Sequence, residues 1–289
     1  MKPASSFVLL APGPQRDLAT DPYDRWLSPD DTVIAEFYRH AGDFLLRFPE
    51  QADFFITRDL RDIRCSPAPD MDEASLQSLF ENSVRPVLSN HAGSLNLHGS
   101  AVNIEGRALA VMGYSRRGKS TLAGALAMRG LPLLTEDVLA ISRTEDRHMV
   151  TPQRASLRVF EDSAAFLLGR PERPQSESEK RDIASGAIPV ASAPVPLGAM
   201  CILGPGETEE LSISPMRQSD ILAEIMQHSF ILDVEDKAAL RSHFERLARL
   251  AEAVPCYALD YPRDFAQFSE TVDTIAAYFQ TEWAADAGQ

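Results

Sequence analysis

Short apolar runs separated by polar residues dominate the first part of the chain. Three such runs, at 43–48, 52–57 and 62–65, contain the aromatic and branched apolar residues that favour short β-strands. A proline-rich stretch at 66–70 predicts a loop, and the apolar spacing of 72–82 predicts an amphipathic helix. This part of the chain therefore has the pattern of a small α+β fold.

A second pattern begins near residue 91. Pro86 predicts a break just before it, so we expect a small N-terminal α+β domain at 1–90 and a larger α/β domain at 91–289. The runs at 95–104 and 107–112 predict two paired strands joined at Glu105-Gly106.

The rest of the second domain alternates strand and helix patterns. Residues 119–129 predict a helix, and Gly130 follows it where a C-terminal glycine belongs. The stretch 170–196 is rich in Pro, Ser, Glu and Lys and predicts a mobile surface loop. Further strands are expected at 138–142, 198–203, 210–213 and 254–259, and further helices at 220–229, 237–252 and 268–279.

Composition limits the classes of function. The 289 residues are 44% hydrophobic, which suits a sizeable core, and carry a formal net charge of -14. Such an acidic chain argues against nucleic acid or an anionic membrane as the main partner. No apolar stretch approaches the roughly 20 residues that span a bilayer. The three cysteines, Cys65, Cys201 and Cys256, have no metal-ligand spacing, so buried thiols in a reducing cytoplasm are expected.

The run Gly113-Tyr114-Ser115-Arg116-Arg117-Gly118-Lys119-Ser120 matches the phosphate-binding loop G-x-x-x-x-G-K-[ST]. A predicted strand precedes it and a predicted helix follows it, which is the structural context that this motif requires. Gly113 and Gly118 permit backbone angles that let successive N–H groups point at phosphate oxygens. We expect Lys119 to reach the β- and γ-phosphates of ATP and the Ser120 hydroxyl to ligate Mg²⁺.

The motif assigns no role to three residues in or next to the loop. Thr121 lies one position too far along the chain to replace Ser120 as the metal ligand. Arg116 and Arg117 add positive charge inside the loop, where either a phosphate contact or a solvated arginine would explain them.

Two adjacent acids follow soon after the loop. Glu136 and Asp137 lie in the segment Leu133-Leu134-Thr135-Glu136-Asp137-Val138, and Asp137 follows Lys119 by only 18 residues (137 minus 119). Carboxylates beside a triphosphate need Mg²⁺ to offset their repulsion, which fits a Mg²⁺-dependent site. Because adjacent strand residues point to opposite faces, one of the two acids is expected to face the γ-phosphate. Solvated acids in a turn are the alternative.

The order of three segments resembles the HPr kinase/phosphorylase superfamily, whose core is similar to that of ATP-dependent phosphoenolpyruvate carboxykinases. These segments are Leu97-His98-Gly99-Ser100-Ala101-Val102, the phosphate-binding loop, and Leu133-Leu134-Thr135-Glu136-Asp137-Val138. The resemblance implies an α/β P-loop kinase core, with Glu136 accepting the proton of a substrate hydroxyl and Asp137 supporting the metal. It also implies that His98 lies near the transferred phosphoryl group, although a lone histidine in an apolar strand is often a core residue.

The resemblance extends more weakly to HPr-kinase-related proteins of biosynthetic clusters, through segments at 154–160 and 254–259. Some of these relatives phosphorylate ribosomally made precursor peptides, including lasso-peptide precursors. The arginine-glycine-rich signature of true HPr kinases is not visible later in the chain, which argues against HPr itself as the substrate. Arg154, Arg158, Lys180 and Arg181 are further candidates for phosphate contacts, with a solvated or structural role as the alternative.

We therefore expect a cytoplasmic kinase that uses ATP and Mg²⁺ to phosphorylate a serine-type hydroxyl on a peptide or small protein. A kinase for HPr or a small molecule, and a nucleotide-binding regulator without catalysis, are the alternatives. For the N-terminal domain we expect either recruitment of the substrate or formation of a homo-oligomer.

Overall fold

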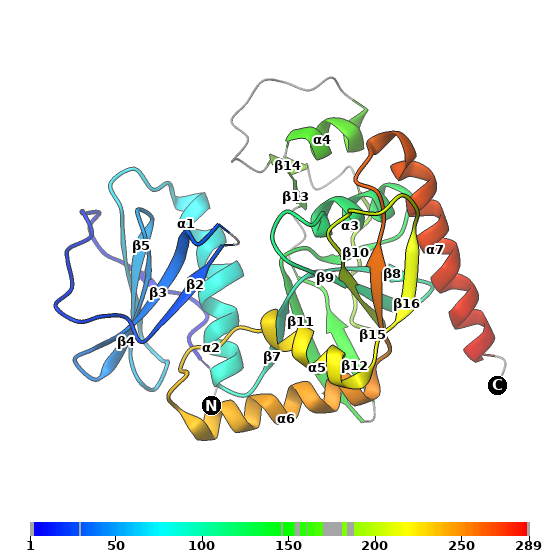
Figure 1. Cartoon of the computed structure of the whole chain (residues 1–289). Coiled ribbons are helices and arrows are strands. Elements are labelled where there is room, and N and C mark those ends of the chain that lie inside the picture. The colour runs from blue at the N-terminus through cyan, green and yellow to red at the C-terminus, as the bar shows by residue number, and fades with distance from the viewer. Residues whose placement is uncertain are drawn as a thin grey trace. The chain divides into compact units, whose positions relative to one another are not determined.

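The computed structural model has a mixed α/β architecture (Figure 1). It describes residues 3–28, 30–145, 147–153, 157–159, 161–169, 181–183 and 188–287. The contacts between residues divide the chain into two compact units. Unit 1 comprises Met1–Asn96 and Phe230–Phe244, and unit 2 comprises Leu97–Ser229 and Glu245–Gln289. The segment Phe230–Phe244 thus packs with the N-terminal unit, although it follows far along the chain.

Unit 1 is built on a six-stranded sheet with the order β1-β6-β5-β4-β3-β2. All neighbouring strands are antiparallel except β1 and β6, which are parallel. The strands are β1 (Val8–Leu9), β2 (Asp24–Leu27), β3 (Val33–His40), β4 (Asp43–Phe48), β5 (Ala52–Ile56) and β6 (Ile63–Pro67). The predicted strands at β4, β5 and β6 are confirmed, whereas β1, β2 and β3 were not predicted.

The helical part of unit 1 is continuous across the expected break. It consists of α1 (Glu73–Leu79), a π-helical turn η1 (Phe80–Val84) and α2 (Arg85–His91). Asp72 caps α1, because its side chain accepts a hydrogen bond from the Ser75 N–H at 2.9 Å. The predicted break at Pro86 is wrong, because Pro86 lies in the first turn of α2, where a missing N–H costs no helical hydrogen bond.

The segment Phe230–Phe244 is fastened to the unit 1 sheet by polar and aromatic contacts. The guanidinium of Arg39 lies between the rings of Tyr23 and Phe44, 4.8 and 4.7 Å from their centroids. It also donates a hydrogen bond to the buried Asp233 at 2.5 Å, while the Tyr23 hydroxyl donates to the Leu232 carbonyl at 2.6 Å. Because the Asp233 carboxylate is buried, its ion pair with Arg39 is needed to offset desolvation.

Unit 2 contains a nine-stranded sheet with the path β10-β8-β9-β15-β12-β11-β7, and β17 and β16 extend it beside β15. The loop-bearing strand β9 runs parallel to β15, and β15 runs parallel to β17. The strands are β7 (Leu95–His98), β8 (Ser100–Ile104), β9 (Arg107–Met112), β10 (Leu133–Thr135), β11 (Val138–Thr144), β12 (Arg147–Thr151), β15 (Val195–Leu203), β16 (Ser212–Pro215) and β17 (Cys256–Asp260).

The run predicted as one strand over 95–104 is divided at Gly99. Its first part, β7, pairs with β11, while β8 pairs with β9 and β10. A Cβ atom at Gly99 would lie 2.8 Å from the Val111 carbonyl oxygen and 2.8 Å from Leu139 Cδ1. Only glycine fits this close approach. The chain can therefore leave its pairing with β11 at Gly99 and continue as β8 beside β9 and β10.

The apolar core of unit 2 lies between the sheet and the helices α3 and α7, which pack on each other (Figure 1). Val111 from the sheet, Leu122 from α3 and Ile275 from α7 are all fully buried in it. The helices of unit 2 are α3 (Lys119–Met128), α4 (Glu161–Leu168), α5 (Gln218–Gln227) and α7 (Phe265–Ala287), and α6 (Lys237–Ala253) begins in unit 1. The expected helices are therefore confirmed, and α7 is longer than predicted at both ends.

The described part of the stretch predicted as a loop over 170–196 includes a short strand and the first two residues of β15, Val195 and Pro196. Arg181–Ile183 forms β14, which pairs with β13 (Leu157–Val159), so the prediction of loop throughout is wrong. Residues 170–180 and 184–187 of that stretch lie outside the described residues. Cys65, Cys201 and Cys256 are buried with free thiols, as predicted.

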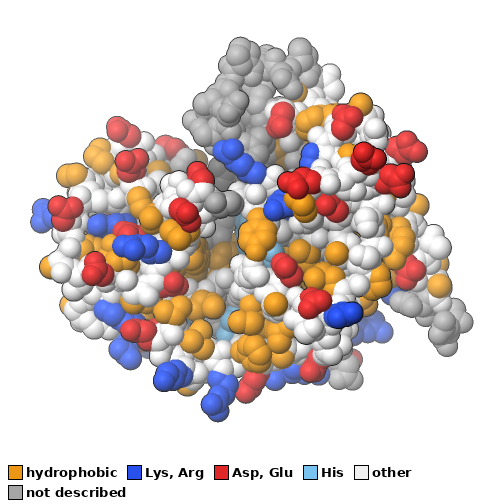
Figure 2. Space-filling view, in the orientation of Figure 1, with side chains coloured by type: hydrophobic (Ala, Val, Ile, Leu, Met, Phe, Trp, Pro, Cys, Tyr) orange, Lys and Arg blue, Asp and Glu red, His pale blue; other side chains and the backbone are white. Residues whose placement is uncertain are grey.

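Acidic and basic side chains are interspersed with apolar ones over the visible face of each unit (Figure 2). Among the helices that the structure describes, we find none with the length and apolar character needed to cross a membrane.

Candidate functional site

The predicted phosphate-binding loop connects β9 to α3. Gly113 and Gly118 have φ angles of +149° and +90°, and Arg116 also adopts a positive φ of +64°. Gly118 is the residue that precedes α3 and supplies no side chain to cap it. The N–H groups of the first helical turn are therefore turned toward the loop, at the positive end of the helix dipole. This is the local geometry that binds a phosphate group.

The ammonium group of Lys119 lies folded over this loop. It donates hydrogen bonds to the carbonyl oxygens of Gly113 at 2.8 Å and Tyr114 at 3.1 Å. The side chain is only 8% exposed, so its charge is largely removed from water. A buried ammonium held by neutral carbonyl oxygens is well placed to exchange them for an anionic oxygen.

Ser120 and Glu136 meet at the start of α3. The Ser120 hydroxyl donates to Glu136 Oε1 at 2.8 Å, and Glu136 is 5% exposed. Glu136 is held there by the turn between β10 and β11, where the Thr135 hydroxyl donates to the Val138 carbonyl at 2.7 Å. The site thus places one of the two adjacent acids directly against the serine of the loop.

The other acid, Asp137, contacts His98 through its backbone. The Asp137 carbonyl accepts the Gly99 N–H at 3.1 Å and lies 3.1 Å from His98 Nδ1. Because a carbonyl oxygen only accepts hydrogen bonds, Nδ1 of His98 carries the proton in this contact. The predicted roles of Asp137 at the metal and of His98 near the phosphoryl group remain predictions.

The remaining loop residues face different neighbours. The Tyr114 hydroxyl donates to the Gln227 side chain at the end of α5, and Arg117 lies 6.0 Å from the Tyr114 ring centroid. Ser115 and Arg116 are exposed. The hydroxyl of Thr121 is 2.9 Å from that of Ser163 on α4, so Thr121 links two helices.

The other arginine and lysine candidates cannot be placed beside the loop. Arg154 and Lys180 lie outside the described residues. Arg158 and Arg181 belong to β13 and β14, and the structure describes their backbone only.

Two residues that the sequence did not single out also pack against the loop. Tyr261 follows β17 and is buried, and a Cβ atom at Gly118 would lie 3.6 Å from its hydroxyl oxygen. His228 follows α5 and stacks edge-on to Tyr114, with ring centroids 5.8 Å apart. Neither residue belongs to a recognisable motif, so only the folded chain brings them to the site.

The oxygen donors at Ser120 and Glu136 fit a magnesium ion. Hydroxyl and carboxylate oxygens are the hard ligands that Mg²⁺ prefers, and Mg²⁺ usually adds phosphate oxygens and water to one or two protein ligands. Among the described residues, no group of three or more His, Cys, Asp or Glu side chains could hold a metal by itself. A magnesium site here would therefore be shared with a phosphorylated ligand.

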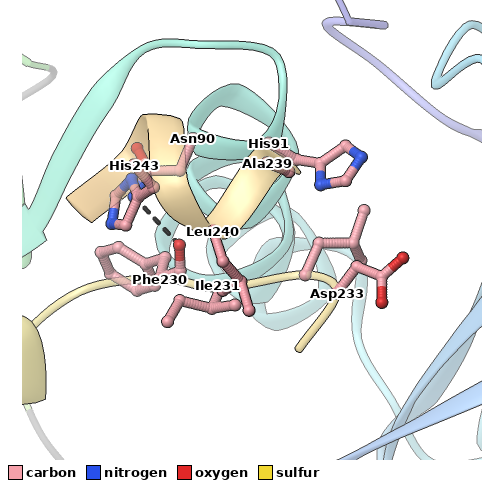
Figure 3. A pocket seen from close by; sticks show the side chains of 9 residues that line it. Asn90, His91, Phe230, Ile231, Asp233, Ala239, Leu240 and His243 are labelled. Carbon is pink, nitrogen blue, oxygen red and sulfur yellow. Dashed lines mark hydrogen bonds between the residues drawn. The ribbon is translucent and has the colours of Figure 1, made fainter. Parts of the chain in front are cut away.

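A separate small hollow lies within unit 1 (Figure 3). It is formed by the end of α2, the segment from Phe230 to Asp233 and the start of α6. The Asn90 side chain lines it and donates a hydrogen bond to the Phe230 carbonyl at 3.1 Å. Its volume of about 10 Å³ is close to the space of one water molecule, which excludes a nucleotide.

Comparison with known proteins finds similar solved structures. The chain is similar to the HPr(Ser) kinase/phosphatase from Coxiella burnetii, with 11% identity and a TM-score of 0.38 over 65% of this chain and 98% of that one. No protein-family model matches the sequence, and no curated protein matches it.

The acid stability of the protein should depend on His228. Burial, and then the nearby Lys119 ammonium, lower the pKa of His228 from 6.5 to about 4. The His228 ring is therefore protonated below about pH 6.5 in the unfolded chain, but only below about pH 4 in the folded protein. The contribution of the neutral His228 ring to the free energy of unfolding is complete above pH 6.5 and is lost as the pH falls toward 4.

We expect the wild-type protein to lose about 2 kcal/mol of unfolding free energy between pH 7 and pH 5 through this residue. His228→Gln, which cannot titrate, should lose correspondingly less. Denaturant unfolding of both proteins at the two pH values measures the difference. Equal losses in the two proteins would contradict the low pKa.

Proposed function

We propose that this chain is a Mg²⁺- and ATP-dependent kinase that phosphorylates a serine-type hydroxyl on a peptide or small protein. The observation that supports it best is the meeting of Lys119, Ser120 and Glu136 on one glycine-bounded loop. A cation, a hydroxyl and a carboxylate at a helix N-terminus are the groups that phosphoryl transfer requires. A ribosomally made precursor peptide, such as a lasso-peptide precursor, is our first choice of acceptor.

Each group has a defined task in this proposal. The backbone N–H groups of the loop hold the β-phosphate, and Lys119 moves from the Gly113 and Tyr114 carbonyls to the β- and γ-phosphate oxygens. Ser120 and Glu136 would hold Mg²⁺, which neutralises phosphate charge when bound. The site is thereby organised around the charge that develops during transfer.

The transfer itself exchanges one P–O bond for another. The acceptor hydroxyl oxygen forms a bond to the γ-phosphorus while the bond from that phosphorus to the β-γ bridging oxygen breaks, and ADP leaves. The hydroxyl proton passes to a carboxylate, for which Glu136 and Asp137 are the two candidates. The contact of Glu136 with Ser120 favours Glu136 as the acid nearest the phosphates.

A nucleotide-binding regulator without catalysis is the second candidate. It is favoured by the hydrogen bond between Ser120 and Glu136, because a carboxylate engaged with the loop serine is less available as a base. Kinase action on HPr or on a small molecule is a third candidate of the same chemical class. The N-terminal unit would recruit the acceptor or form a homo-oligomer.

The decisive experiment is a transfer assay with the full chain, Mg²⁺-ATP and a set of acceptors. These are candidate precursor peptides, HPr and small hydroxyl compounds. Phosphorylation adds about 80 Da to the acceptor and is read by mass spectrometry. We expect the gain on a peptide serine, and its loss when that serine is replaced by alanine or Mg²⁺ is removed.

The other outcomes separate the alternatives. Transfer only to HPr or to a small molecule would replace the peptide as acceptor. Nucleotide binding without transfer to any acceptor would favour the regulator. Absence of nucleotide binding would overturn the proposal as a whole.

A further inference from the structure

His228 has a ring nitrogen that the described protein does not satisfy. The residue follows α5, is 5% exposed, and its Nε2 atom has no hydrogen-bond partner among the described residues. A buried polar atom without a partner costs free energy, so native proteins keep few of them without a reason. A ligand that completes the hydrogen bond is one such reason.

The surroundings of this ring belong to the phosphate-binding loop. The imidazole packs edge-on to the Tyr114 ring, and the Lys119 ammonium is close enough to lower its pKa, after the larger effect of burial. Tyr114 lies in the motif, and Lys119 is the motif lysine expected to contact the phosphates. The ring that carries the unsatisfied nitrogen therefore packs against the phosphate-binding loop.

The backbone around His228 is fixed on two sides, which holds the ring in place. Its carbonyl accepts the His98 N–H at 2.7 Å, and Ser229 forms an antiparallel bridge with Leu97. The preceding residue, Gln227, accepts the hydrogen bond of the Tyr114 hydroxyl. The end of α5 is thus fastened to both β7 and the loop, and a side chain held in this way can contact a ligand with little loss of entropy.

We infer that His228 Nε2–H donates a hydrogen bond to a phosphoryl oxygen of the nucleotide bound at the loop. This inference rests on the proposed nucleotide site and adds a contact residue to it. A phosphoryl oxygen only accepts hydrogen bonds, so the ring must be the tautomer with its proton on Nε2. A neutral N–H donor adds direction to the contact, while Lys119 supplies the positive charge.

The test compares two replacements of His228. His228→Gln keeps an N–H donor of similar reach, whereas His228→Leu removes it. We expect the dissociation constant of the Mg²⁺ complex of adenylyl imidodiphosphate, measured by calorimetry, to rise about tenfold to a hundredfold in His228→Leu. In His228→Gln we expect it to stay within about threefold of the wild-type value.

His148 provides the matched control. It is also buried in unit 2, on β12, and its Nδ1 atom has no partner among the described residues. His148→Leu should leave nucleotide affinity unchanged, because His148 has no described contact with the loop. An equal loss in His148→Leu and His228→Leu would show a general effect of removing a buried imidazole and would overturn the inference.

A second readout uses the wild-type protein and does not depend on any variant folding. The ¹⁵N resonance of His228 Nε2 should move when the same nucleotide complex is added. An unchanged resonance in nucleotide-saturated protein, or wild-type affinity in His228→Leu, would overturn the role of His228 alone. Failure of the wild-type protein to bind the nucleotide would instead overturn the proposed function.

Discussion

Replacing Lys119 by methionine is expected to lower the rate of phosphoryl transfer by about 10³-fold, the scale on which a single charge-stabilising group acts. Methionine has a similar length and fills the same space, but it carries no charge and no donor. The buried ammonium that now faces the Gly113 and Tyr114 carbonyls is lost, and with it the contact to the developing charge on the γ-phosphate. Nucleotide affinity should fall by about tenfold or more.

Lys237→Met is the matched control for this variant. Lys237 is an exposed lysine at the start of α6 in unit 1, so its replacement changes the net charge equally without touching the loop. Calorimetry measures binding, and single-turnover mass spectrometry measures transfer. Retention of both by Lys119→Met would exclude the loop as the nucleotide site.

Glu136→Gln should lower the rate of phosphoryl transfer by about 10²- to 10⁴-fold, while the loop still binds nucleotide. Glutamine keeps an acceptor oxygen for the Ser120 hydroxyl, which lies 2.8 Å from Glu136 Oε1, and removes only the negative charge. Because that charge would hold Mg²⁺ or accept the substrate proton, the Mg²⁺ concentration needed for half-maximal transfer should also rise.

Two further variants sharpen this test. Asp137→Asn makes the same change in the neighbouring acid, and we expect it to have the smaller effect because Glu136 is the acid that contacts Ser120. Glu105→Gln, in the exposed turn between β8 and β9, controls for the loss of one negative charge. A larger defect in Asp137→Asn than in Glu136→Gln would assign the essential carboxylate to Asp137.

The elements that carry the loop could be predicted because local patterns determine them. The strand before the loop and the start of the helix after it are as expected, and Gly130 adopts the positive φ of +88° that follows a helix end. Val33–His40 was missed, although Val33, Ala35 and Phe37 alternate as strand residues do, because charged residues interrupt its apolar run.

The parts of the site that could not be predicted depend on contacts between distant segments. Alternation predicted that one of two acids would face the phosphates, but the turn held by Thr135 decides that Glu136 reaches Ser120. His228 lies 109 residues after Lys119 (228 minus 119) in a segment with no motif. Its place beside Tyr114 follows from the bridge between Ser229 and Leu97, which sequence periodicity does not encode.

The return of Phe230–Phe244 to unit 1 has a consequence for the order of events during synthesis. Arg39 and Tyr23 can meet their partners Asp233 and Leu232 only after the ribosome has added 137 residues beyond Asn96 (233 minus 96). At roughly 5–20 residues per second, this interval is about 7–30 s. During that time the nascent N-terminal sheet lacks these partners, so unit 1 is completed only after residues 97–229 of unit 2 have been synthesised.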